Sequence, residues 1–201
     1  MGVYLATDRL TLRRFTDADV DALVELDSDP EVTRFLTRAR PVREKVARET
    51  IPRMIAYYED HPGFGTWAAI EKATGDFIGW FHLRPAHEDG RDDEPELGYR
   101  MRRAAWGKGY ATEGSRALID RAFNDLGARR VFALTMAVNT GSRRVMEKAG
   151  LRYIRTFTTT WPERLPGDEH GDVEYSITRA EWEAERMGGP GDRSDAQSSP
   201  R

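Results

Sequence analysis

The stretch AAWGKGYATEG, residues 104–114, decides the fold, because it joins a strand-like run to a helix-like run through closely spaced glycines. Gly107 and Gly109 flank Lys108, and a helical pattern of apolar residues follows from Tyr110 onward. Glycines directly before a helix let backbone N–H groups approach a phosphate, and the positive end of the helix dipole favours an anion there. The stretch therefore predicts a phosphate-binding loop, and the question is which phosphate compound it holds.

Two nucleotide-binding signatures do not fit this loop. A Walker A loop needs a glycine at the position of Arg102 and a serine or threonine at the position of Gly109. A dinucleotide fingerprint needs a third glycine where Thr112 stands, and an acidic residue after a second parallel strand, whereas Asp125 falls within the following helix. Neither a P-loop nucleotide nor a dinucleotide is therefore predicted.

The remaining interpretation uses the small residues that are present. The alternation of Gly107, Gly109 and Ala111 predicts an open loop into a helix whose first N–H groups have no intrahelical acceptor. Such a loop suits a pyrophosphate, and Lys108, Arg102 and Arg103 add positive charge. A plain turn whose glycines supply positive φ is the alternative.

The rest of the chain reads as one α/β domain over residues 1–187. The expected order is β-α-α-β-β-β-α-β-α-β-β, a mixed sheet of about six or seven strands with helices on it. Strands are predicted over residues 9–15, 66–71, 77–83, 95–101, 130–138, 151–157 and 173–177. Helices are predicted from Thr16, over residues 42–59 with a kink or break at Pro52, and over residues 110–126, 139–150 and 180–187. Residues 188–201 are small and polar, and we expect a disordered tail.

The composition excludes several classes of protein. The 201 residues contain no cysteine, which excludes disulfides and thiolate sites, and the net charge of -3 gives no reason to expect a nucleic-acid partner. No apolar run is long enough to span a membrane, and the N-terminus lacks the apolar core of a secretory leader. A cytoplasmic protein with no membrane partner is expected.

Four motifs in order resemble the GNAT N-acetyltransferase superfamily, and within it the RimJ/RimL-type ribosomal-protein N-terminal acetyltransferases. They are TDRLTLRRFTDADVDAL (7–23), ELGYRMRRAAWGKGYATEG (96–114), NTGSRRVMEKAGL (139–151) and EYSITRAEW (174–182). Many members of the superfamily carry Arg or Gln directly before the glycines. This chain has Trp106, as is common in the RimJ/RimL branch.

The resemblance implies the GNAT fold, a mostly antiparallel mixed sheet in which two splayed strands form a groove for acetyl-CoA, with no metal. It implies that main-chain groups around Met101 and Arg103 hold the pantetheine arm, that the loop holds the pyrophosphate, and that Asn139 and Ser142 lie near the sulfur. The expected cofactor-binding residues are Met101, Arg102, Arg103, Trp106, Gly107, Lys108, Gly109, Tyr110, Ala111, Thr112, Asn139 and Ser142.

Acetyl transfer to an amine needs a base for the amine proton and an acid for the leaving thiolate. We favour Glu96 as base, directly or through a water, and Ser142 as acid; the alternatives are an ordinary strand carboxylate and a serine that bonds its own helix turn. Superfamily members often place a Tyr seven residues after the motif Asn, but this chain has Met146 there. Tyr153 and Tyr175 are reserve candidates for the acid, with core or wall positions as the alternative.

The amine acceptor is the least defined part. The resemblance suggests a protein N-terminal α-amine, while aminoglycosides, polyamines, amino-sugars and a non-catalytic acyl-CoA-binding domain stay as alternatives. Acceptor choice is expected to lie in residues 32–62 and 158–172, and the acidic run 87–96 is either an attractor for a cationic amine or simply solvated. His82 and His87 lack the further ligands of a metal site. The sequence leaves open whether the chain acts alone or as a homodimer.

Overall fold

The computed structural model describes residues 2–37, 39–86, 91–158 and 164–187. In the N-terminal half the elements are β1 (Val3–Ala6), β2 (Leu10–Arg14), α1 (Val20–Ser28), α2 (Pro30–Thr33), α3 (Arg43–Lys45), α4 (Ile51–Asp60), β3 (Gly65–Glu71) and β4 (Phe77–Ala86). In the C-terminal half they are β5 (Arg91–Met101), α5 (Tyr110–Asn124), β6 (Arg130–Met136), α6 (Thr140–Lys148), β7 (Arg152–Phe157), β8 (Asp172–Thr178) and α7 (Arg179–Met187).

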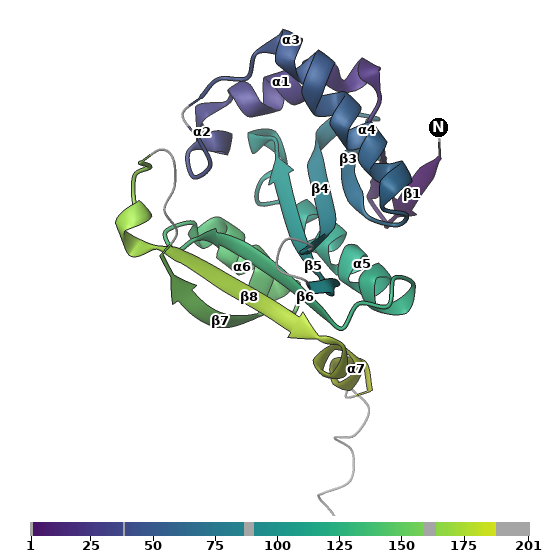
Figure 1. The fold of residues 1–201 in the computed structure, drawn as a ribbon, viewed down its shortest axis with the longest axis vertical. Helices are drawn as coiled ribbons and strands as arrows, with labels where there is room; N and C mark the ends of the chain where they lie inside the picture. The colour runs from purple at the N-terminus through teal and green to yellow at the C-terminus, as the bar shows by residue number, and fades with distance from the viewer. Residues whose placement is uncertain (1, 38, 87–90, 159–163, 188–201) are drawn as a thin grey trace, which may run out of the picture.

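The strands form one open sheet in the order β1-β2-β3-β4-β5-β6-β8-β7 (Figure 1). The sheet has eight strands, one more than expected, because the short edge strand β1 pairs with β2 ahead of the first predicted strand. Every neighbouring pair is antiparallel except β5 and β6. The mixed, mostly antiparallel sheet expected from the resemblance is confirmed.

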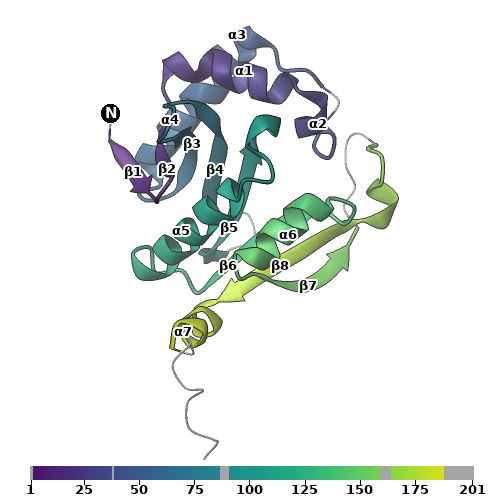
Figure 2. The same cartoon turned by 180° about the vertical axis from the view of Figure 1, so that it is seen from behind.

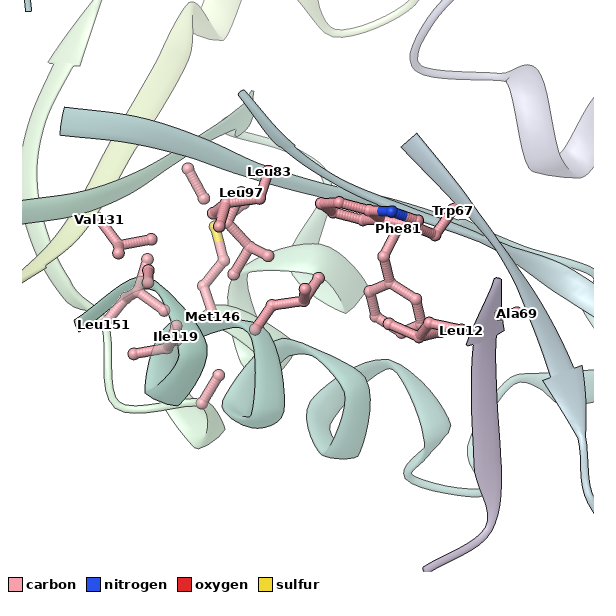
Figure 3. Close-up of a cluster of buried hydrophobic side chains, with 14 of the residues drawn as sticks. Leu12, Trp67, Ala69, Phe81, Leu83, Leu97, Ile119, Val131, Met146 and Leu151 are labelled. Carbon is pink, nitrogen blue, oxygen red and sulfur yellow. The ribbon is translucent and has the colours of Figure 1, made fainter. Parts of the chain in front are cut away.

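Helices α5 and α6 cover one face of this sheet, as Figure 2 shows. Leu118, Ile119, Ala122 and Phe123 of α5 and Met146 of α6 are buried against alternating strand residues such as Leu83 and Leu97. In Figure 3, Phe81 and Met146 fill the space between the sheet and α5. Alternate strand residues face opposite sides of a sheet, so this packing fixes which side chains of β4 and β5 face the other way.

The opposite face of the N-terminal half is covered by α1 and α4 (Figure 1). A second core cluster forms there from Phe15, Leu23, Leu26, Ile51 and Ala68, with Trp80 packed against it. The β4 side chains of Trp80, His82 and Arg84, and the β5 side chains of Glu96 and Arg100, therefore lie on the same face as α1 and α4.

The predicted break in the helix over residues 42–59 takes the form of a π-helical turn. Residues 43–60 are helical throughout, with α3, a π-helical segment over Val46–Thr50, and α4 following one another. The N–H of Ile51 reaches back to the carbonyl of Val46, one residue further than in an α-helix. Pro52 has no N–H to donate, and the widened turn lies directly before it, so helical structure continues across the proline.

Across the described residues, no helix combines the length and apolarity that crossing a membrane requires. The predicted tail, residues 188–201, lies outside the described residues.

Candidate active site

The glycine loop leads directly into α5. Gly107 has φ +73° and Gly109 has φ +84°, the left-handed region that favours glycine, and Tyr110 begins the helix. A Cβ added at Gly107 meets nothing within 4 Å, and at Gly109 it meets a single arginine nitrogen at 3.4 Å. The glycines thus adopt the turn conformation and leave the loop open to approach, which is compatible with both interpretations made from the sequence.

The third glycine of the stretch is required for a different reason. Gly114 lies inside α5, where an added Cβ would come within 2.2 Å of the Phe81 ring. It lets α5 pack closely on the sheet and so sets where the helix N-terminus stands. Trp106 is 45% exposed, and its indole N–H donates to the Met101 carbonyl at 2.9 Å, which ties the loop to the end of β5.

Arg9 and Glu113 brace the loop from the N-terminal hairpin. Arg9 donates from Nη1 to the Lys108 carbonyl (2.9 Å), pairs with Glu113 of the first helical turn (2.6 Å), and lies over the Tyr110 ring. Thr7 also donates to Glu113, at 2.6 Å. The sequence reasoning missed Arg9, because a contact across about a hundred residues leaves no local pattern.

The two predicted arginines near the loop are engaged by the acidic N-terminal helices. Arg102 pairs with Glu25 of α1 at 2.7 Å and lies over the Phe77 ring, and Arg103 lies 3.7 Å from Asp29. Their guanidinium groups therefore clamp α1 and α2 to the end of β5. The positive charge left beside the glycines comes from Lys108 and the helix terminus.

An open groove of about 710 Å³ adjoins the loop along α5. Its lining joins Arg9, Gly109, Thr112 and Arg116 to Lys148 at the end of α6. Arg116 donates to the Lys148 carbonyl at 2.9 Å and 2.5 Å, which fixes the two helices at this side. The volume lies in the range of small-molecule binding sites.

Strands β5 and β6 diverge beside this loop. Their parallel pairing consists of one residue pair, Glu96 with Phe132, after which β5 continues with β4 and β6 with β8 (Figure 1). Beyond Glu96, the edge of β5 that faces β6 has no strand partner among the described residues. Backbone N–H and C=O groups on such an edge are available to a ligand.

Asn139 and Ser142 stand at the start of α6. Asn139 caps the helix, since its side-chain oxygen accepts from the Ser142 N–H at 3.2 Å. The Ser142 hydroxyl lies 3.0 Å from the hydroxyl of Tyr99, and the Tyr99 hydroxyl also donates to the Ser142 carbonyl at 3.0 Å. Burial raises the pKa of Tyr99, so the phenol stays protonated. Tyr99 was not among the predicted residues.

Glu96 lies on the other face of β5, toward α1 and α4. It is half-buried and stands directly opposite Arg84 in the β4–β5 register. Burial raises the pKa of Glu96, and the charge of Arg84 opposes this in part. Glu96 and Ser142 therefore reach the diverging segment of β5 from opposite faces of the sheet.

His82 occupies the same face between two arginines. Its Nε2 is buried without a hydrogen-bond partner, and the ring lies so close to Gly98 that a Cβ there would come within 2.4 Å. Burial, together with Arg84 and Arg100, lowers the pKa of His82 to about 3, so the imidazole is neutral. No cluster of three metal-binding side chains occurs in the described ranges; His87 lies outside them.

The reserve tyrosines have other partners. Tyr175 is buried, donates to Glu147 at 3.0 Å and accepts from Arg143 at 3.1 Å. Tyr153 is 50% exposed, with its hydroxyl 2.9 Å from that of Thr156. Met146 is buried in the core. Both tyrosine hydroxyls are thus engaged by neighbouring side chains.

A family model described as an acetyltransferase (GNAT) domain matches residues 9–152. The chain belongs to the GNAT acetyltransferase family. This GNAT chain is 38% identical over 183 residues to the FsC-acetyl coenzyme A-N(2)-transacetylase of Aspergillus fumigatus, covering 89% of this chain and 77% of that protein. It is 28% identical over 183 residues to the putative ribosomal N-acetyltransferase YdaF of Bacillus subtilis, covering 89% and 96%. The chain is therefore an acyltransferase, and its recognition as a GNAT member is confirmed.

Solved structures agree with the GNAT fold. RimL, a ribosomal-protein alpha-N acetyltransferase in complex with coenzyme A, matches with a TM-score of 0.71 at 17% identity, over 88% of this chain and 98% of that one. The aminoglycoside acetyltransferase AAC(6')-Ib in complex with coenzyme A matches with a TM-score of 0.68 at 24% identity, over 88% and 99%. Proteins with different acceptors share this fold, so the fold alone does not resolve the acceptor.

Proposed function

We propose that this chain is an acetyl-CoA-dependent N-acetyltransferase that acts on a primary amine. The observation that carries the proposal is the divergence of β5 from β6 beside an open glycine loop at the start of α5. The pairing leaves a backbone edge for the pantetheine arm, and the loop leaves room for the pyrophosphate. Acetyl-CoA supplies the activated acetyl group.

The pyrophosphate and nucleotide end of acetyl-CoA would be held by main-chain groups more than by charged side chains. N–H groups of the first turn, Tyr110 to Thr112, have no intrahelical acceptor, and Lys108 adds one positive charge. The groove lined by Arg9, Arg116 and Lys148 lies next to this turn and is large enough for the nucleotide end. Arg102 and Arg103 hold α1 and α2 in place through their side chains, and the Arg102 N–H and carbonyl are already bonded to Ile78 and Ala105.

Glu96 acts in the proposal as the base. The amine nitrogen must lose a proton as its bond to the acetyl carbon forms and the carbon–sulfur bond breaks. Glu96 takes that proton, directly or through a water. Burial raises the pKa of Glu96, which makes its carboxylate a stronger base than an exposed glutamate.

Ser142 serves the leaving thiolate. Its hydroxyl is held by Tyr99 at the start of α6, where the helix dipole also favours negative charge. The Ser142 hydroxyl would give its proton to the departing thiolate as the carbon–sulfur bond breaks, so that CoA leaves as the thiol, and Ser142 would then regain a proton from solvent. An N–H group on the unpaired edge of β5 would stabilise the developing oxyanion.

The acceptor in this proposal carries a nucleophilic nitrogen. The Aspergillus fumigatus relative is named for acetyl coenzyme A and for transfer at N(2), and it is the more similar of the two named relatives. This adds support for a small-molecule amine as acceptor. The protein N-terminal α-amine expected from the resemblance stays as the second candidate. Both are tested by the same screen.

Calorimetric titration with acetyl-CoA, NAD and ATP tests the donor. Acetyl-CoA binding without NAD or ATP binding is expected; binding of NAD or ATP but not acetyl-CoA would exclude the proposal. Release of free CoA thiol on addition of amines then separates an enzyme from a domain that only binds acyl-CoA. The panel contains peptides, amino-acid derivatives, polyamines and aminoglycosides. If none of these amines causes release of free CoA thiol, the chain only binds acyl-CoA and the alternative is favoured.

A further inference from the structure

Arg84 is a half-buried cation beside the proposed base. It lies opposite Glu96 in the β4–β5 register, on the face covered by α1 and α4. Within the part of the chain that the structure describes, its side chain makes one hydrogen bond, from Nη2 to the Thr66 hydroxyl at 2.6 Å. Its Nε is buried without a partner, and its guanidinium lies 5.3 Å from the Tyr57 ring centroid.

Two other arginines on this side of the sheet are paired with carboxylates. Arg100 is 2.5 Å from Asp27, and Arg102 is 2.7 Å from Glu25. Arg84 forms no ion pair with a described carboxylate, although Glu96 stands on the neighbouring strand. Burial of a cation without a paired anion costs free energy unless a ligand compensates it. Burial lowers the pKa of Arg84, and the nearby Tyr57 and Glu96 oppose this only in part.

The spacing of the two groups suits one kind of acceptor. Side chains directly opposite on antiparallel strands have Cβ atoms about 5 Å apart, so Glu96 and Arg84 reach into the same space. In an α-amino acyl group, the amine nitrogen and the carbonyl oxygen are separated by two carbon atoms. Glu96 would meet the amine while Arg84 donates to the carbonyl or carboxylate oxygen, for which its planar fork is suited.

We propose that Arg84 is a specificity-determining residue that selects acceptors whose amine stands next to a carbonyl or carboxylate group. The inference rests on the proposed function and narrows its acceptor. The chemistry is shared by free amino acids, amino-acid derivatives and peptide N-termini. It is absent from aminoglycosides and simple polyamines.

Matched acceptors test this proposal. Initial rates of CoA release are measured with L-phenylalaninamide and 2-phenylethylamine, and with L-alaninamide and ethylamine. The wild-type protein should prefer the carbonyl-bearing member of each pair by roughly 10- to 100-fold in kcat/KM, since a charged hydrogen bond is lost otherwise. Arg84→Met should reduce this preference by roughly 10-fold relative to the wild type at the same pH, so that only the part due to the lower basicity of the amides is left. Phenylalanine carries a free carboxylate next to its amine, and an alanyl tripeptide carries a peptide carbonyl there. Comparing their rates shows which of the two groups Arg84 recognises.

Control variants separate recognition from folding. Arg152→Met removes an exposed arginine on β7 that pairs with Glu181 and Glu185, and it should keep the wild-type preference. Arg84→Lys keeps the positive charge but lacks the planar guanidinium, and it should retain part of the preference for the carbonyl-bearing amines. This variant tests the proposal if Arg84→Met does not fold. Acetyl-CoA affinity, measured by calorimetry, should be the same in all three variants.

The outcomes distinguish this inference from the proposed function. Equal rates for both members of each pair, an unchanged preference in Arg84→Met, or turnover of aminoglycosides or polyamines in place of the amides would overturn the selection by Arg84 while leaving N-acetylation intact. Acetyl-CoA binding with no amine acetylated would overturn the proposed function itself.

Discussion

The hydroxyl of Tyr99 lies 3.0 Å from both the hydroxyl and the carbonyl oxygen of Ser142, which connects β5 to the start of α6. Tyr99 faces the α5 and α6 side of the strand, whereas Glu96, three residues earlier, faces α1 and α4. The proposed acid and base therefore act from the two faces of one strand, at the point where that strand leaves its parallel neighbour.

Tyr99→Phe should lower kcat by about 5- to 10-fold and change KM for acetyl-CoA less than about threefold. The loss follows because Ser142 is no longer held in one orientation, while the phenyl ring still fills its place beside Phe81. Steady-state kinetics measure this. Tyr153→Phe, on exposed β7, is the matched control and should match the wild type. An unchanged kcat in Tyr99→Phe would remove Tyr99 as a positioning residue.

Glu96→Gln should lower kcat/KM by roughly 10²- to 10⁴-fold, the contribution typical of a general base. In the wild type, activity should rise with pH as Glu96 loses its proton, with this limb displaced above the usual glutamate range because burial raises its pKa. The limb should disappear in Glu96→Gln. Glu185→Gln, at an exposed position of α7, serves as control. A wild-type acid limb that persists in Glu96→Gln would assign the base elsewhere.

Gly107→Ala should weaken acetyl-CoA binding and cost about 1 kcal/mol of unfolding free energy. Gly75→Ala provides a matched control, since Gly75 has φ +78° in the β3–β4 turn and an added Cβ meets nothing within 4 Å. The control should lose similar stability and keep its affinity for acetyl-CoA. Calorimetry and thermal unfolding measure the two effects. Equal affinities in both variants would show that the loop glycines serve the turn alone.

His82→Phe should flatten the pH dependence of stability on the acid side. Burial, with Arg84 and Arg100, lowers the pKa of His82 from 6.5 to about 3 in the folded state, so only the unfolded state binds this proton between those values. Stability is therefore lost as pH falls below 6.5, by about 1 kcal/mol between pH 6.5 and pH 5.5. Denaturant unfolding at pH 6.5 and pH 5.5 measures the difference. Parallel curves for the wild type and the variant would contradict the buried, neutral imidazole.

The order of elements was predictable because each rests on a local pattern. The apolar face of α5, the buried run of β6 and the caps of α6 are all written within short windows of sequence. The short edge strand β1 was missed because four residues give too little alternation to read. The π-turn before Pro52 was predicted as a kink because the sequence shows the missing N–H and not how the backbone accommodates it.

Some parts of the candidate site could be predicted from the sequence, and others could not. The left-handed turn at Gly107 and Gly109 and the side-chain cap of Asn139 are local features, so the sequence pattern predicted them. The contacts of Arg9 with the loop and of Tyr99 with Ser142 depend on packing between distant segments, and no local signal reveals them. The ion pairs that occupy Arg102 and Arg103 are of the same kind.

The most direct test of the central claim is product analysis by mass spectrometry, with purified protein, acetyl-CoA and a panel of α-amines and other amines. We predict that at least one amine gains a single acetyl group on nitrogen, in step with release of CoA thiol, and that Glu96→Gln forms this product far more slowly. Acetyl-CoA that binds but is never consumed, or acetylation at equal rates in the wild type and Glu96→Gln, would contradict the account.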